Sequence, residues 1–225
     1  MRLSHEDELK INGAIREAER KTSGEILCIY TDRVSEYSEV ALGYAAGVAL
    51  LLPLALVAAG LRPWAIEEML AGWRLGGAEP APEAGALAYA MLQTVIFVLM
   101  LALMSIRKVR LWLTPEPLRR AKVHRAAVQQ FLAKGLHQTE ARTGVLIFAS
   151  AADRHAEVVA DEGIYKKVPE DIWAEALEVL GKGMKRGDPA EGFVGAISLC
   201  GDVLAEHFPP TSANPNEIPD ELVQL

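Results

Sequence analysis

Cysteine is scarce in this sequence, whose 225 residues contain only two, Cys28 and Cys200. Each lies inside an apolar segment, where a thiol usually packs as a small hydrophobic side chain. Two isolated cysteines do not make the disulfide framework of a small secreted domain. We therefore expect two free, buried thiols and a reducing compartment.

A surplus of positive charge is also missing. The chain has 23 Lys and Arg residues against 30 Asp and Glu residues, a formal net charge of −7. A surface that binds nucleic acid needs a concentrated basic face, so no nucleic-acid partner is expected. The first ten residues, MRLSHEDELK, are polar and acidic with no apolar core behind them, and we expect no cleavable signal peptide.

Charged residues are absent from two long stretches, 40–61 and 84–106. Each exceeds the roughly 20 residues that a helix needs to cross a bilayer. The alternative, two core helices of a soluble protein, is disfavoured because only about 150 residues remain to bury them. The pattern predicts a transmembrane hairpin with helices at about 40–61 and 84–106. Neither stretch contains Asp, Glu, His, Lys or Arg, which argues against a transport role.

The first apolar stretch contains a proline, Pro53, which a membrane-spanning helix tolerates. It also carries small residues that would let a second helix approach closely. We expect this contact at Gly43, Ala46, Gly47 and Ala49.

Basic residues follow the second apolar stretch at once. They are Arg107, Lys108, Arg110, Arg119, Arg120, Lys122 and Arg125. By the positive-inside rule this flank stays in the cytoplasm, and two spans return the chain to the side where it began. We expect a multi-pass protein of the plasma (inner) membrane with both termini cytoplasmic and with the basic cluster against lipid headgroups.

The soluble segments show helix and strand patterns in alternation. Ser4 and Asp7 have the spacing of a capping box, and the helix they open should stop near Gly24. The apolar segment EILCIYTD then predicts a buried strand ending at Asp32. After the hairpin, Thr114 and Pro115 are typical of a helix start.

A second strand, in ARTGVLIFASAAD, repeats the pattern of the first: a helix end, Thr and Gly, an apolar strand and a closing Asp. This echo predicts two helix–strand units side by side in one sheet, with the hairpin inserted between them. HAEVVAD should pair with the second strand as a hairpin, joined through Ala152, Asp153 and Arg154.

Two helices should close the soluble part. PEDIWAEALEVL predicts a short helix that Gly181, Gly183 and Gly187 break, and Asp188 opens a last helix. The segment 210–225 lacks periodicity and is expected to be disordered. The predicted organisation is a discontinuous α/β domain at 1–39 and 113–209, a hairpin at 40–112 and a tail at 210–225.

The assembled pattern resembles the TPM domain. The resemblance rests on AIREAERKTSGEILCIY, on FLAKGLHQTEARTGVLIFASAADRHAEVVADEGI and on IWAEALEVLGKGMKRGDPAEGFVGAISLCGDVLAEHFP. It is strongest with the membrane-embedded bacterial branch, in which a transmembrane hairpin interrupts the domain. It implies an α/β sandwich with a central mixed sheet flanked by helices. The family's activity is less uniform, since some relatives resemble acid phosphatases or calcium binders and others act as accessory subunits of membrane complexes.

Acidic side chains follow the predicted strands. Hard cations such as calcium or magnesium prefer oxygen ligands, and ends of neighbouring strands often form ligand sites. We therefore consider a metal site built from Asp32, Asp153, Asp161 and Glu162. The alternative is that these residues only form turns, which is common for Asp at strand ends and for an Asp-Glu-Gly sequence.

Other chemistry finds little support in the sequence. Arg154 matches an arginine that the resembled family has in the loop between these two strands. The alternative is that Arg154 is a surface residue that pairs with a nearby acid. The five histidines lack the spacing of zinc ligands. No catalytic triad, phosphate-binding glycine loop or dinucleotide fingerprint is present, and no catalytic residue is assigned.

Two functions remain open. The first is a cytoplasm-facing binding or accessory module, anchored in the lipid bilayer, for a membrane-protein partner, with a homo-oligomer possible. The alternative is a metal-dependent phosphatase that uses the four carboxylates around calcium or magnesium.

Overall fold

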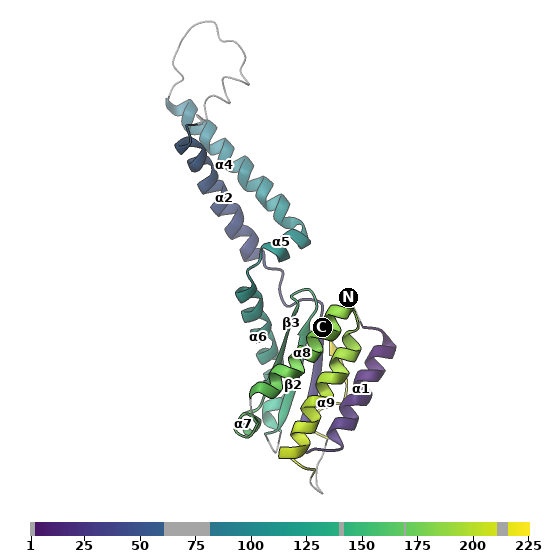
Figure 1. Ribbon diagram of the computed structural model, residues 1–225. Helices are drawn as coiled ribbons and strands as arrows, with labels where there is room; N and C mark the ends of the chain where they lie inside the picture. The colour runs from purple at the N-terminus through teal and green to yellow at the C-terminus, as the bar shows by residue number, and fades with distance from the viewer. Residues whose placement is uncertain (1–2, 61–81, 140–141, 169, 211–215) are drawn as a thin grey trace, which may run out of the picture. The chain divides into compact units, whose positions relative to one another are not determined.

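The computed structural model describes residues 3–60, 82–139, 142–168, 170–210 and 216–225. The chain folds into two compact units, shown in Figure 1. Met1–Ser35 and Glu116–Leu225 together form the first unit, and Glu36–Pro115 forms the second. The first unit is an α/β fold, and the second is helical in the part that the structure describes.

A mixed four-stranded sheet is the centre of the first unit. Its strand order is β3-β2-β1-β4, with β1 at Glu25–Thr31, β2 at Gly144–Ser150, β3 at His155–Ala160 and β4 at Leu222–Gln224. β1 runs parallel to β2 and β4, whereas β3 is antiparallel to β2. This topology confirms the side-by-side arrangement of the two echoed units and the hairpin between β2 and β3.

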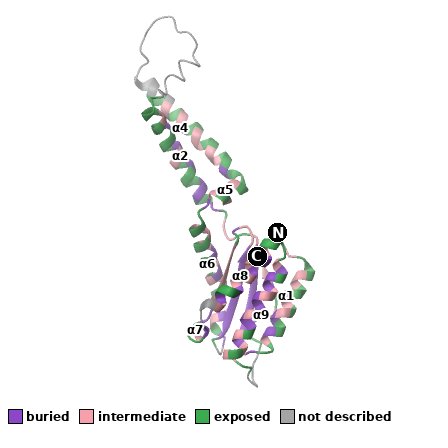
Figure 2. Cartoon of the chain, viewed as in Figure 1, coloured by how far each residue is buried: buried purple, intermediate pink, exposed green. Residues whose placement is uncertain are grey.

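Helices cover both faces of the sheet, which explains why every residue of β1 and β2 is buried (Figure 2). Ile15, Phe193 and Ile147 belong to the core on one face, and Val123 and Phe148 to the core on the other. The first face is covered by α1 (His5–Glu19), α8 (Glu170–Arg186) and α9 (Pro189–His207). The second is covered by α6 (Glu116–Ala133) and the 3-10 helix η1 (Leu136–Gln138).

The predicted helix starts are confirmed at two helices. The Ser4 hydroxyl accepts a hydrogen bond from the Asp7 backbone N–H at 3.2 Å, and the Asp7 carboxylate accepts one from Ser4 N–H at 3.1 Å. The Asp188 carboxylate accepts one from the Glu191 N–H at 3.0 Å at the start of α9. Each bond satisfies a backbone donor that the helix itself leaves open.

The predicted break at Gly181 and Gly183 is wrong, because α8 continues to Arg186. Gly183 serves packing instead: a Cβ there would overlap the backbone of Gly192 in α9, so only glycine lets the two helices approach this closely. Gly187, with φ of 81°, is the residue that ends the helix.

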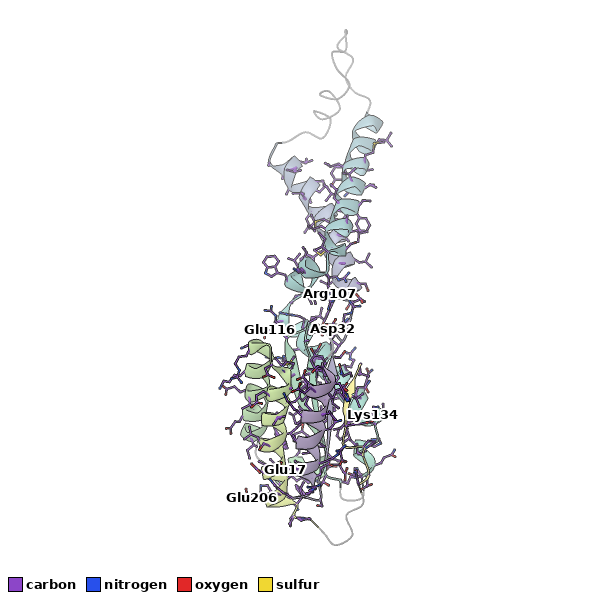
Figure 3. All side chains as sticks on the ribbon, turned by 90° about the vertical axis from the view of Figure 1, so that its right-hand side faces the viewer. Glu17, Asp32, Arg107, Glu116, Lys134 and Glu206 are labelled. Carbon is purple, nitrogen blue, oxygen red and sulfur yellow. The ribbon has the colours of Figure 1, made fainter. Side chains whose placement is uncertain are left out.

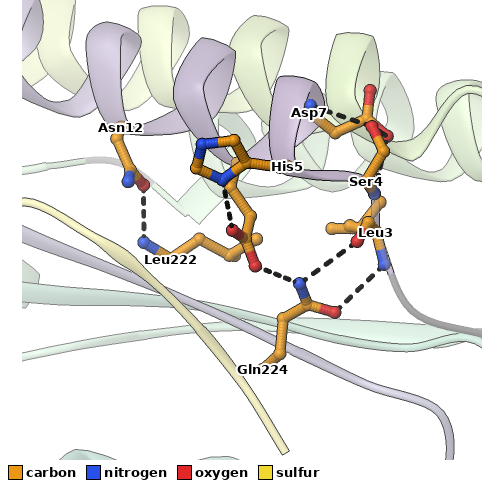
Figure 4. A network of polar contacts seen from close by, with 8 residues as sticks. Leu3, Ser4, His5, Asp7, Asn12, Leu222 and Gln224 are labelled. Atoms are coloured by element: carbon orange, nitrogen blue, oxygen red, sulfur yellow. Dashed lines mark hydrogen bonds and ion pairs between the residues drawn. The ribbon is translucent and has the colours of Figure 1, made fainter.

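The prediction of a disordered tail is wrong for residues 216–225. Within them β4 pairs with Cys28–Tyr30 of β1, and the network in Figure 4 ties the strand to the N-terminal segment. The Leu222 N–H donates to the Asn12 side chain at 2.7 Å, and the Gln224 side chain accepts from Leu3 N–H at 3.0 Å. Three residues are too few to show a strand period, so the sequence pattern could not reveal β4.

In its described residues, 36–60 and 82–115, the second unit has two long helices that pack together and a short one. They are α2 (Ser38–Ala58), α4 (Pro82–Ser105) and α5 (Arg107–Leu113). α2 is long and apolar enough to cross a membrane; Tyr89–Ser105 passes the same test only together with α5, from which it is bent by 99°. The connection between the two predicted membrane helices, residues 62–83, lies almost wholly outside the described residues.

The small residues that are buried in α2 differ from those predicted. Ala41, Ala45, Ala49 and Pro53 recur every fourth residue and are buried, together with Val40. Gly43 and Ala46 are exposed, so of the predicted contacts only Ala49 is buried. The predicted and the observed residues are all small and lie on different faces of the same helix. The sequence alone does not show which of these faces is buried.

Candidate functional site

The structure divides the four predicted carboxylates into two pairs at opposite ends of the sheet. Asp32 follows β1, and its carbonyl accepts a hydrogen bond from the Ala152 N–H at 2.8 Å, so it lies beside the turn that contains Asp153. Asp161 and Glu162 follow β3, whose last residue, Ala160, is paired with Val145 near the start of β2. In Figure 3, Asp32 is labelled at one end of the α/β unit, and Glu17 of α1 is labelled at the other end.

The length of β2 sets the separation between the two pairs. Gly144 and Ser150 lie six residue steps apart, which at about 3.3 Å per step is about 20 Å. Calcium and magnesium hold their oxygen ligands at roughly 2.0 to 2.6 Å. One cation therefore cannot contact all four carboxylates, and the single site predicted for Asp32, Asp153, Asp161 and Glu162 is corrected to two separate pairs. Among the described residues, no three His, Cys, Asp or Glu side chains are grouped to hold a metal ion.

Asp153 is a buried carboxylate that joins two loops. It is only 2% exposed, and one of its oxygens accepts hydrogen bonds from the Ser150 hydroxyl at 2.5 Å and from the Val34 N–H at 3.0 Å. These bonds fasten the segment after β1 to the turn between β2 and β3. Arg154, next in this turn, adopts the left-handed backbone conformation with φ of 53°.

Asp161 caps a short helix. Its carboxylate accepts a hydrogen bond from the Glu162 N–H at 2.6 Å at the start of α7 (Glu162–Tyr165). The predicted turn is thus the first turn of a helix. The other carboxylate oxygen of Asp161 is buried with no hydrogen-bond partner within the described part of the chain, whereas Glu162 is exposed and pairs with Lys166 at 2.8 Å. The Lys166 ammonium group lowers the pKa of Glu162.

A solvent-open pocket of about 510 Å³ lies at the end of β1 where Asp32 is found. Its apolar residues are Val34, Ala126, Phe148 and Leu225, and its polar residues are Thr31, Asp32, Arg33, Gln129 and Gln130. The Thr31 hydroxyl donates to the Arg33 and Leu225 carbonyls at 3.1 and 3.3 Å, which holds the wall of the pocket. The carboxyl ends of parallel strands are a common place for ligands in open α/β sheets.

Two glutamines of this pocket, Gln129 and Gln130, are not among the site residues predicted from the sequence. Both lie on α6, where Gln129 is exposed on the side opposite Ala127, and Gln130 is half-buried on the same side as Val123, seven residues earlier. Amide side chains can donate and accept hydrogen bonds, so they suit a peptide or another polar partner. The helical period of α6 predicts that Gln129 is exposed, but only the fold places it and Gln130 beside the end of β1.

Two histidines that are distant in the sequence meet at one carboxylate. His155 Nε2 lies 3.2 Å from one oxygen of Glu157, and His124 Nδ1 lies 3.6 Å from the other. The histidine spacing had suggested scattered positions. The contact arises because α6 packs against β3.

A second acidic group lies at the opposite end of β1. Glu19, Glu25 and Asp220 come from α1, β1 and the segment before β4. Burial raises the pKa of Glu19 to about 9, and the negative charges of Glu25 and Asp220 add to the shift. Burial also raises the pKa of Glu25, although its carboxylate accepts a hydrogen bond from the Ile218 N–H at 3.2 Å.

Comparison with known proteins agrees with this architecture. Residues 100–203, slightly less than half of the chain, match the family model of the TPM domain. Among solved structures, the chain is similar to the NMR structure of the BA42 protein from the psychrophilic bacterium Bizionia argentinensis, with a TM-score of 0.56 over 100% of this chain and 97% of that chain. The two sequences are 18% identical, so the likeness concerns the fold. A search of curated proteins gave no match.

Proposed function

We propose that this chain, with its TPM-domain match at residues 100–203, is a membrane-anchored protein whose α/β unit is a cytoplasm-facing binding or accessory module for a membrane protein complex. The anchor is the helix pair α2 and α4, in the plasma (inner) membrane. The module is the unit that carries the pocket at the end of β1.

The main support is that α2 and α4 expose large apolar side chains, the reverse of what a water-soluble protein does. The buried residues of α2 are mostly small. Leu51 and Met91, for example, are each 67% exposed. The exposed set in the two helices is Leu42, Leu50, Leu51, Leu52, Leu54, Val57, Leu87, Met91, Val95, Val98, Leu99 and Leu103. Water-soluble proteins rarely expose an apolar surface this continuous, whereas lipid requires one.

The charges at the helix ends support the proposed orientation. Arg107 and Lys108 begin α5, one residue after the end of α4, and Arg110 pairs with Glu36 at 3.1 Å just before α2 begins. A basic flank at the open end of a hairpin favours its retention in the cytoplasm. The α/β unit continues from both open ends, so it faces the same compartment.

The anchoring is tested by washing membranes at alkaline pH. An embedded hairpin stays in the pellet and leaves it only with detergent, whereas a peripheral protein is released by the wash. Release of the intact chain would contradict the proposal.

The accessory role is tested with a photo-crosslinking residue at one position of the pocket. With the crosslinker at Gln129, we expect one membrane protein to be captured, and none with the crosslinker at Asp202, an exposed position on α9. Equal capture from both positions, or none from Gln129, would contradict a partner at this pocket.

The alternative, a metal-dependent phosphatase, gains no support from geometry because the acids form two distant pairs. It has a direct test in phosphate release from an ester by the purified chain with calcium or magnesium. Activity that Asp161→Ala abolishes would contradict a purely accessory role.

A further inference from the structure

The short helix α5 turns sharply away from the helix before it. α4 ends at Ser105, and α5 begins at Arg107 with its axis bent by 99° from Tyr89–Ser105. The turn is made at Ile106, whose φ and ψ of −72° and 108° are extended. If α4 crosses the bilayer, as the proposed function requires, a helix at nearly a right angle to it runs along the membrane surface.

The direction of α5 is fixed by contacts within the helical unit. The Arg110 guanidinium donates to the Met104 carbonyl of α4 at 3.5 Å and pairs with Glu36 at 3.1 Å. The Tyr44 hydroxyl of α2 donates to the Leu113 carbonyl at 3.2 Å. α5 is therefore tied to both long helices, which a freely moving linker would not be.

The outer face of α5 combines a large aromatic side chain with a cation. Trp112 is 83% exposed, more than any other large hydrophobic residue that the structure describes. Lys108 lies four residues earlier, on the same helical face, and is also exposed. Lys108 makes no ion pair among the described residues. An exposed indole in water is unfavourable, while at a membrane interface its ring is buried and its N–H stays hydrated.

We propose that α5 is an interfacial helix that binds the headgroup layer of an anionic phospholipid bilayer. The Trp112 indole lies among the headgroups, and the Lys108 ammonium contacts a lipid phosphate. The occupant is a lipid surface because α5 is separated by one residue from a helix whose own exterior is apolar. A seven-residue helix is too short to bind a membrane alone, so its position depends on the hairpin.

The depth of Trp112 can be measured in the full-length protein in vesicles. The chain has three other tryptophans, Trp64, Trp73 and Trp173, which are replaced by phenylalanine. Trp173→Phe should be tolerated because the indole nitrogen of Trp173 is buried without a hydrogen-bond partner in the described part of the chain. The vesicles contain lipids brominated either near the headgroup or near the end of the acyl chain.

We expect Trp112 fluorescence to be quenched at least about twofold more by the shallow bromines than by the deep ones. Stronger quenching by the deep bromines would overturn the proposal by showing that α5 continues into the bilayer. Quenching by aqueous iodide alone would overturn it too, since the face would then be free for water or a protein partner.

The charge contribution is tested with Lys108→Gln. In vesicles with anionic lipid, the protection of Trp112 from iodide should weaken as salt is raised, and K108Q should remove about half or more of this salt dependence. Lys134→Gln, an exposed lysine of the α/β unit, is the matched control and should leave it unchanged. An unchanged salt dependence in K108Q would overturn the lysine contact.

The alkaline wash separates failure of this inference from failure of the proposed anchoring. If the chain stays in the membrane but Trp112 faces water, the interfacial helix is wrong and the anchor stands. If the wash releases the chain, the proposed function fails with it.

Discussion

The side chain of Glu19, at the end of α1, accepts a hydrogen bond from the backbone N–H of Ile26 in β1 at 2.8 Å. Burial raises the pKa of this carboxyl group to about 9, and the nearby negative charges of Glu25 and Asp220 act in the same direction. Glu19 is therefore protonated at neutral pH and joins α1 to β1.

The raised pKa of Glu19 predicts a loss of stability in alkali. Its ordinary value is 4.5, so the unfolded chain binds fewer protons than the folded chain between about pH 4.5 and pH 9. The stabilisation is fully present below this window and is lost as pH rises through it. The raised pKa of Glu25 acts in the same direction. We expect the thermal unfolding midpoint of the full chain in detergent to fall from about pH 6 to about pH 9.

The matched variants for this prediction lie on one helix. Glu19→Gln keeps a neutral side chain of the same shape, so it should reduce the fall of the unfolding midpoint with pH. Glu17→Gln, at an exposed position paired with Lys21, should leave that fall unchanged. Equal slopes in E19Q and wild type would show that Glu19 does not titrate in this window.

Removing the Asp153 carboxylate should destabilise the α/β unit. In Asp153→Ala the Val34 N–H and the Ser150 hydroxyl lose their acceptor, and the free energy of unfolding should fall by about 2 to 4 kcal/mol. Asp202→Ala, at an exposed site on α9, should change it by less than about 0.5 kcal/mol. Denaturant unfolding followed by circular dichroism compares the two, and similar values would contradict the structural role of Asp153.

Enlarging a buried alanine of α2 should disturb the helical unit. Ala45 is fully buried, and Ala45→Leu forces extra volume into its packing at a cost of about 1 to 3 kcal/mol. Ala46→Leu adds the same volume at an exposed position and should be tolerated. Resistance of the helices to unfolding in sodium dodecyl sulfate is the measurement. Greater sensitivity in A46L than in A45L would mean that α2 is rotated from the face described.

Local patterns in the sequence predicted much of the fold. The capping residues Ser4 and Asp188 marked helix starts because their hydrogen bonds are made within one turn. The echo of two apolar strands, each closed by an Asp, predicted that β1 and β2 lie side by side in one sheet, where they pair in parallel. These features depend on neighbours in the chain, so they can be found without knowledge of the tertiary structure.

The candidate sites depended on contacts that no local pattern contains. Asp161 and Asp32 both follow strands, but β3 is antiparallel, as the predicted hairpin implies, so Asp161 lies at the opposite end of the sheet. The meeting of Glu19 with Asp220 requires β4, which is too short to predict. His124 and His155 meet only because α6 packs against β3.

The sidedness of the chain in the membrane tests the central claim most directly. Single cysteines are placed at Gly77, between the two apolar stretches, and at Glu206, exposed on α9. The native Cys28 and Cys200 are buried, and burial raises the pKa of both thiols, so they should contribute little background. A membrane-impermeant maleimide is applied to intact and to permeabilised cells.

We predict that Gly77→Cys is labelled in intact cells and that Glu206→Cys is labelled only after permeabilisation. Labelling of both positions in intact cells, or of both only after permeabilisation, would contradict a hairpin that spans the membrane with the α/β unit in the cytoplasm.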